Sequence, residues 1–204
     1  MILDKTDSSY APLREAIGDL SRTDADLAPK KRGLNIEGLT AARDGKVLLI
    51  GLRNPQKNGK ALLLELAGFD QYLLGDPGQL ALGKLIEIDL GGRSIRDIAW
   101  SEAHKSYVIV AGQVVDRIPG PGFALYKWDG AGAPIQISDF KDLDHDFQPE
   151  AAVPLFDKSD DGLVPSKRIL ILSDEGAVEL GDGQKCKKAD EKQRRFRGVI
   201  RHVD

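Results

Sequence analysis

The fold is decided by the stretch Asn35-Ile-Glu-Gly-Leu39, which a turn connects to Val47-Leu-Leu-Ile50. In this pattern an acidic residue lies in a short apolar strand, and the strand after the turn is almost purely aliphatic. The chain repeats the pattern at Ile95–Trp100 with Tyr107–Val110, and again at Gln148–Val153 with Arg168–Ile171. Repeats of this size, made of strands and Gly-rich turns, are typical of the blades of a β-propeller.

Short strand patterns fill the rest of each repeat, so the sequence predicts an all-β, propeller-like fold of about three four-stranded blades. The expected strands are 37–40, 47–52, 60–66 and 85–90; 95–100, 107–112, 123–128 and 134–137; and 150–155, 167–173 and 196–201, with the fourth strand of the last unit unassigned. Hairpin turns are expected at Asp44-Gly45, Asn58-Gly59 and Asp129-Gly130, and one helical turn within 69–75. The equivalent neighbours of the acidic residues, Ile36, Ile98 and Ala151, are expected to be buried.

One amphipathic helix precedes the strands. Leu13, Ala16, Ile17 and Leu20 have helical spacing within residues 9–20. We therefore divide the chain into an N-terminal helix with a polar linker, residues 1–33, and a β-propeller-like domain, residues 34–204.

Composition restricts the class of partner. The chain has 204 residues, 41% of them apolar, and a formal net charge of −3, so no global field attracts nucleic acid or a membrane surface. The single cysteine, Cys186, excludes an intrachain disulfide and is expected to be an exposed thiol. The N-terminus has no export signal, so the chain as written is expected in the cytoplasm, and the location is open if the N-terminus is truncated.

Three units are fewer than the four to eight blades of closed propellers. The sequence therefore predicts a partial propeller whose ring is completed by a missing N-terminal segment or by a second copy in a homodimer. Alternatively, the helix that contains Leu13 covers one open edge of a monomer.

Candidate site residues follow from the repeat, because the innermost strand of each blade lines the central channel of a propeller. Glu37, Asp97 and Glu150 recur 60 and 53 residues apart, and converging carboxylates favour Ca²⁺ or Mg²⁺ or act as acid and base. A second set of equivalent polar residues lies just after the next strand of each repeat and consists of Arg53, Gln113 and Asp174. The mixed charge of this set suggests that Arg53, together with Arg96, neutralises the carboxylates. The alternative is that both sets only join one blade to the next.

Two further segments have candidate chemistry. Arg53-Asn54-Pro55 directly follows a strand, and its guanidinium and amide could bind an anionic ligand, although Asn-Pro is also an ordinary turn. Asp142-Leu-Asp-His-Asp146 resembles the start of a calcium loop but lacks the Gly and the distal Glu that such a loop needs. The basic run 185–197 is typical of a solvated hairpin tip, with an anion-binding patch as the alternative.

The chain resembles a bacterial family known as domain of unknown function 3616. The resemblance rests on six ordered motifs, Gly33–Leu39, Ile50–Pro55, Gly59–Leu62, Asp89–Asp97, Phe123–Trp128 and Pro149–Ala151. Members of the family usually have more strands upstream of the helix. The family implies no activity, but its acidic repeats are similar to those of phytase-like and gluconolactonase-like propellers, whose metal-bound members use axial carboxylates. The leading expectation is therefore a soluble ligand-binding propeller with an axial site for a small anionic or metal-bridged ligand, extending to ester or phosphoester hydrolysis. The alternative is a non-catalytic protein-interaction module.

Overall fold

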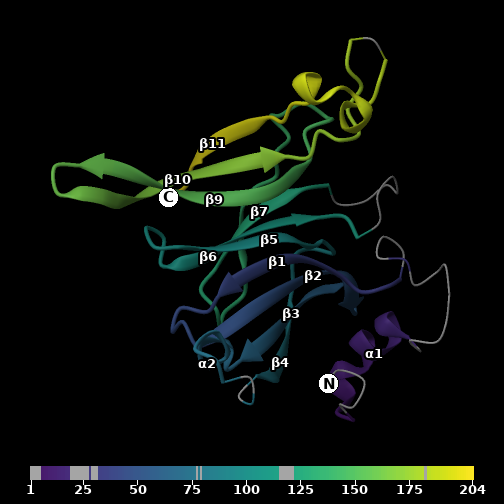
Figure 1. Cartoon of the computed structure of the whole chain (residues 1–204), viewed down its shortest axis with the longest axis vertical. Helices are drawn as coiled ribbons and strands as arrows, with labels where there is room; N and C mark the ends of the chain where they lie inside the picture. The colour runs from purple at the N-terminus through teal and green to yellow at the C-terminus, as the bar shows by residue number, and fades with distance from the viewer. Residues whose placement is uncertain are drawn as a thin grey trace.

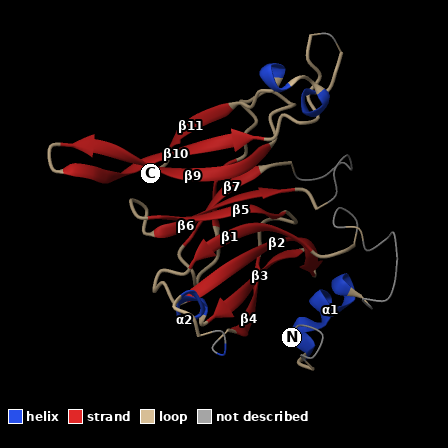
Figure 2. Cartoon of the chain, viewed as in Figure 1, coloured by secondary structure: helices blue, strands red, loops and turns tan. Residues whose placement is uncertain are grey.

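The protein is all-β, with three antiparallel sheets stacked one on the next (Figures 1 and 2). The computed structural model describes residues 6–18, 28, 32–76, 78, 80–114, 122–181 and 183–204. The predicted helix is present in its first part, as the 3-10 turn η1 (Ser8–Tyr10) followed by α1 (Ala11–Ile17). The expected end of this helix at Leu20 and most of the polar linker lie outside the described residues.

The strands of the described residues follow one another in chain order within each sheet. The first sheet has the order β1-β2-β3-β4, the second β5-β6-β7-β8 and the third β11-β10-β9. Their bounds are β1 Asn35–Ala41, β2 Val47–Lys57, β3 Lys60–Ala67, β4 Ala81–Ile88, β5 Ser94–Ser101, β6 Ser106–Gly112, β7 Ala124–Trp128, β8 Ile135–Ser138, β9 Pro149–Ser159, β10 Gly162–Ser173 and β11 Gly198–His202. The short helix α2 (Phe69–Leu73) accounts for the helical turn expected within 69–75. This is a partial propeller-like fold, as the repeats predicted.

Stacking of the sheets creates two cores. Strand β5 packs against β1 and β2 on one side and against β9 on the other. The core between the first and second sheets includes Leu63, Ile98 and Ile109, and the core between the second and third includes Val108 and Ile171. Each sheet therefore buries apolar side chains against the next, as blades do.

Two glycines allow the first and second sheets to approach closely. A Cβ atom on Gly51 would lie 2.6 Å from Ile95 Cγ2, and one on Gly38 would lie 3.0 Å from the same atom. A side chain at Gly51 would therefore require Ile95 to move, and one at Gly38 would press on Ile95 and Ile98.

Helix α1 covers part of the other face of the first sheet. Tyr10 and Leu13 pack on Leu52, Leu62 and Leu64, and the Tyr10 hydroxyl donates a hydrogen bond to the carbonyl of Gly83 on the edge strand β4. The helix and this hydroxyl thus cover part of the first sheet at its edge strand β4.

A β-bulge interrupts the inner strand of each sheet at the same place. Ile36 pairs with Leu52 and Gly38 with Gly51, which leaves Glu37 as the extra residue of β1. The same shift leaves Arg96 as the extra residue of β5 and Glu150 as that of β9. The structurally equivalent set is therefore Glu37, Arg96 and Glu150, and our assignment of Asp97 to this set is wrong by one residue.

The second equivalent position also changes. Leu52, Ala111 and Ser173 pair with the residue before each bulge, so the residues that follow them, Arg53, Gly112 and Asp174, are equivalent. The assignment of Gln113 to this set is corrected to Gly112.

The expected burial of Ile36, Ile98 and Ala151 is wrong as a set. Ile98 is 1% exposed, but Ile36 is 52% exposed and Ala151 is only partly buried. The reason is their position in the stack: Ile98 lies between two sheets, whereas Ile36 pairs with Leu52 on the outer face of the first sheet.

Two other features differ from expectation. Cys186 is buried, and its sulfur lies 3.4 Å from the backbone nitrogen of Arg195, so it is not an exposed thiol. Strands β9 and β10 continue beyond the sheet as a paired ribbon over Phe156–Pro165, which Figure 1 shows as a projecting hairpin.

No helix among the described residues is long and apolar enough to cross a membrane.

Candidate functional site

A row of alternating charges crosses the three sheets at the bulges. Glu37 Oε1 accepts a hydrogen bond from Arg53 Nη1 at 3.0 Å, and Glu37 Oε2 accepts one from Arg96 Nη1 at 2.8 Å. Arg96 Nε lies 3.3 Å from Glu150 Oε2 on the third sheet. Arg96 is thus shared by carboxylates from the two sheets that flank its own. We call Arg53, Glu37, Arg96 and Glu150 the bulge row.

Local structure fixes both arginines. Arg53 Nε donates to the carbonyl of Val114 at 3.0 Å, which joins β2 to the segment after β6. The Arg96 guanidinium lies over the Phe123 ring, 5.6 Å from its centroid, a favourable cation–π arrangement. A Cβ on Gly112 would lie 2.6 Å from Phe123 and 3.1 Å from Arg96 Nε, so the glycine at this position makes room for both side chains.

The carboxylates, rather than the guanidinium groups, face solvent. The Arg53 and Arg96 side chains are 1% and 3% exposed, whereas those of Glu37 and Glu150 are 21% and 34% exposed. A ligand that approaches the bulge row therefore meets Glu37 and Glu150 first, with two buried positive charges behind them.

Burial raises the pKa of Glu150 from 4.5 to about 7. The neighbouring Arg96 lowers this pKa and Glu37 raises it, since one favours and the other opposes a negative charge at Glu150. Near neutral pH the Glu150 carboxyl is therefore divided between a protonated and an ionised form. Such a group can donate a proton to a ligand or take one from it.

Asp97 has a different position from Glu37 and Glu150. Its two oxygens accept backbone hydrogen bonds from Ile98 at 2.9 Å and from Ala152 of β9 at 2.8 Å. Burial raises the pKa of Asp97, while these two backbone hydrogen bonds lower it. The hydrogen bonds of Asp97 join the second sheet to the third. This matches the alternative in which the acidic residues only join one blade to the next.

The remaining candidates, Asn54 and Asp174, make hydrogen bonds to backbone groups. The Asn54 amide donates to the carbonyl of Gly33 at 2.7 Å, and Asp174 Oδ1 accepts from the backbone nitrogen of Gly176 at 2.8 Å. Asp174 is close enough to raise the pKa of Glu150. Sequence reasoning missed Asn35, whose amide donates to Glu37 Oε1 at 3.2 Å, because no repeat marks this position.

The acidic segment 142–146 is held by two arginines of the C-terminal part. Arg201 Nη2 donates to both oxygens of Asp142, at 2.7 and 2.6 Å. Arg197 binds Asp144 at 2.9 Å and Asp146 at 2.8 Å, and its Nε lies 3.0 Å from the buried Glu175. Arg197, from the end of the basic run, thus attaches this loop to the third sheet.

The metal prediction receives no support from this geometry and stays a prediction. Within the described ranges, no group of three or more His, Cys, Asp or Glu side chains is placed to hold a metal ion. Both oxygens of Glu37 are bound by guanidinium groups, and both oxygens of Asp97 accept backbone hydrogen bonds.

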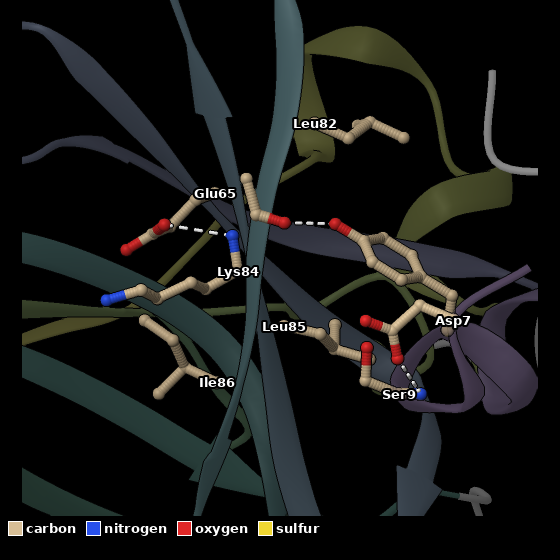
Figure 3. Close-up of a pocket in the computed structure, with 9 residues that line it drawn as sticks. Asp7, Ser9, Glu65, Leu82, Lys84, Leu85 and Ile86 are labelled. Atoms are coloured by element: carbon tan, nitrogen blue, oxygen red, sulfur yellow. Dashed lines mark hydrogen bonds between the residues drawn. The ribbon is translucent and has the colours of Figure 1, made fainter. Parts of the chain in front are cut away.

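A separate shallow hollow of about 610 Å³ lies between η1 and β4 (Figure 3). Its polar lining includes Asp7, Ser9, Glu65 and Lys84, and Glu65 Oε2 accepts a hydrogen bond from the Lys84 backbone nitrogen at 2.9 Å. Residues of the bulge row do not line it. The hollow lies at the place where Tyr10 shields the edge of β4.

Fold and site together define an all-β protein of stacked, propeller-like sheets with a charged row at its inner strands. Residues 16–163 match the family model described as protein of unknown function (DUF3616). The chain belongs to this family, as its motifs indicated. No curated protein and no solved structure matches the chain.

Proposed function

We propose that this protein binds a small ligand through an anionic group, such as a carboxylate or a phosphate, at the bulge row. The observation that supports the proposal is the sharing of Arg96 between Glu37 and a partly exposed Glu150. The ligand oxygen accepts a hydrogen bond from the protonated Glu150 carboxyl, and the buried guanidinium groups attract its charge.

Charge explains why an anion is favoured over a cation. With Glu150 protonated, the row contains two guanidinium groups and one carboxylate, so its net charge is positive. With Glu150 ionised, the net charge of the row is zero. In an interior that is less polarisable than water, this difference acts strongly on a charged ligand.

The proposal requires binding to weaken as pH rises through the pKa of Glu150. Loss of a hydrogen bond between a neutral donor and a charged ligand removes about 1.5–3 kcal/mol, which is at least about tenfold in affinity. Glu150→Gln keeps the size and a donor but cannot ionise, so its affinity should not follow pH.

The experiment is calorimetric titration with sulfate and with acetate at about pH 6 and about pH 8, where the charge of both probes is constant. Wild-type protein should bind the probes more tightly at the lower pH, and Glu150→Gln should bind them equally at both. Glu179→Gln is the matched control, because Glu179 is exposed and far along the chain from the row. A wild-type affinity that does not change with pH contradicts the proposal.

Hydrolysis of an ester or phosphoester is a finer form of the same proposal. A water molecule would attack the ester carbon or the phosphorus, Glu150 would give its proton to the leaving oxygen, and the guanidinium charge would stabilise the negative charge that develops. Turnover of phenyl acetate or phenyl phosphate, whose phenolate leaving group needs a proton, would support it if Glu150→Gln abolishes the turnover and Glu179→Gln does not. Binding without turnover would limit the function to ligand binding.

A further inference from the structure

The outer face of the third sheet has an apolar patch that no other described residues cover. Leu170 pairs with Val153 and Ile200, so the three side chains lie on one face. Val153 is 41% and Ile200 55% exposed. A Cβ on Gly198 would lie 3.1 Å from Leu170 and 3.2 Å from Leu172, which places Leu172 on this face too. We call Val153, Leu170, Leu172 and Ile200 the third-sheet face.

The equivalent face of the other two sheets is covered in each case by the next sheet. Counted from the bulges, Leu170 corresponds to Leu49 of β2 and to Val108 of β6. Leu49 is buried against the second sheet, and Val108 is buried against the third. The third-sheet face therefore has the chemistry and the register of a surface that receives another sheet of this kind.

The first sheet presents the complementary surface. Its outer face corresponds to the faces that contain Ile109 in the second sheet and Ile171 in the third, both of which pack on the preceding sheet. Helix α1 covers this face over Leu52, Leu62 and Leu64, but on the β1 side Ile36 and Leu39 are 52% and 60% exposed. We call Ile36 and Leu39 the first-sheet face.

We propose that two copies of this chain associate about a twofold axis, with the third-sheet face of each copy packed on the first-sheet face of the other. The interface continues the sheet-on-sheet packing that already joins the three sheets within one chain. Two such contacts form at once, and together they arrange six sheets in a ring, a number within the range of closed propellers.

Charge at the inner strands permits this contact. Glu150 of one copy approaches Glu37 of the other, but Glu37 is already bound by Arg53 and Arg96 of its own chain. Because α1 occupies part of the first-sheet face, the apolar area of each contact is smaller than between two sheets of one chain. We therefore expect association in the micromolar range, typical of interfaces below standard size.

The test is sedimentation equilibrium of the full chain across micromolar to submillimolar concentrations. Wild-type protein should change from the monomer mass to twice that mass. Ile200→Lys and Leu39→Lys should each remain monomeric, because each removes one side of both contacts. Ile135→Lys is the matched control, since Ile135 is an exposed apolar residue of strand β8, away from both faces.

Mixing the two monomeric variants distinguishes this mode of association from others. In the mixed pair one contact carries both substitutions and the other carries neither, so a weak dimer should reappear that neither variant forms alone. A monomer at every concentration, association that Leu39→Lys leaves intact, or masses above twice the monomer would each overturn the proposal. Circular dichroism verifies the fold of each variant, and Ile200→Ser with Leu39→Ser provides a milder second pair.

Discussion

Replacement of Glu150 by glutamine should make the protein more resistant to unfolding at high pH, and the effect can be worked out from the structure. The folded protein raises the pKa of Glu150 from 4.5 to about 7, chiefly through burial. Between these two values the folded state holds a proton that the unfolded state releases. Stability therefore falls as pH rises from about 4.5 to about 7 and is constant with respect to this group above that range.

The size of the effect has an upper limit. A tenfold change in proton affinity corresponds to about 1.4 kcal/mol, so a rise from 4.5 to about 7 gives at most about 3.5 kcal/mol. About a third of the Glu150 side chain is exposed, and solvent screening reduces the effect of its charge. We expect about 1–2 kcal/mol, a measurable part of the stability of a domain of this size.

The assay is urea denaturation of wild-type protein and Glu150→Gln at several values between about pH 5 and about pH 8. The difference between the two proteins is the informative quantity, because the titration of all other groups cancels in it. It should shift in favour of Glu150→Gln as pH rises, and the Glu179→Gln control should parallel the wild type. Parallel curves for wild type and Glu150→Gln, or a shift in the opposite direction, would refute the reasoning.

Three further outcomes follow from the packing and the site. Gly51→Ala should lower the free energy of unfolding by about 1–3 kcal/mol, because the new methyl group meets Ile95 at 2.6 Å; Gly181→Ala, with nothing within 4 Å, should change it little in the same urea series. Asp97→Ala should lower the free energy of unfolding by about 1–3 kcal/mol, since the buried amide of Ala152 loses its acceptor. Asp97→Asn should lower it less, because a carbonyl acceptor remains. Equal losses for the two variants would show that the hydrogen bond to Ala152 contributes little. At low millimolar concentration, where general salt effects are small, sulfate should raise the melting temperature at about pH 6 and calcium chloride should not, because a ligand that binds only the folded state stabilises it. A rise with calcium alone would favour the metal prediction over the anion proposal.

Much of the fold could be predicted because each strand carries its own signal. All eleven strands of the described residues overlap an expected strand, and the three hairpin turns fall at the expected dipeptides. Asn58 and Gly59 both have positive φ angles, the conformation for which this dipeptide is selected. Strand existence is thus a local property that side-chain alternation and turn residues specify.

Register could not be predicted in the same way. Residue type aligns Asp97 with Glu37 and Glu150 in the copies of the repeat, whereas the bulges place Arg96 at this position. A bulge depends on how two strands pair, and nothing in the sequence of β5 alone marks it. The same one-residue displacement explains why Gln113 was assigned in place of Gly112.

The projecting hairpin was missed for a related reason. The expected strands end at residue 155 and begin again at residue 167, and Pro165 between them is unfavourable for regular strand pairing. In the structure Pro165 pairs with Phe156, and a shift of register between Pro165 and Ile169 separates this ribbon from the sheet. Proline is tolerated here because an irregularity lies beside it.

The equivalence of Glu37, Arg96 and Glu150 connects the stability of the fold with the proposed binding. An arginine between two glutamates joins three sheets, but it can neutralise Glu150 only in part, because it is already bound to Glu37 at 2.8 Å. Burial outweighs this partial neutralisation, so the pKa of Glu150 is raised to about 7, close to neutral pH. An anion that accepts a hydrogen bond from Glu150 stabilises the protonated form, so binding near that pH must be accompanied by proton uptake. Calorimetry in two buffers of different ionisation enthalpy measures this uptake directly, and binding heats that are independent of the buffer would exclude Glu150 as the proton donor to the ligand.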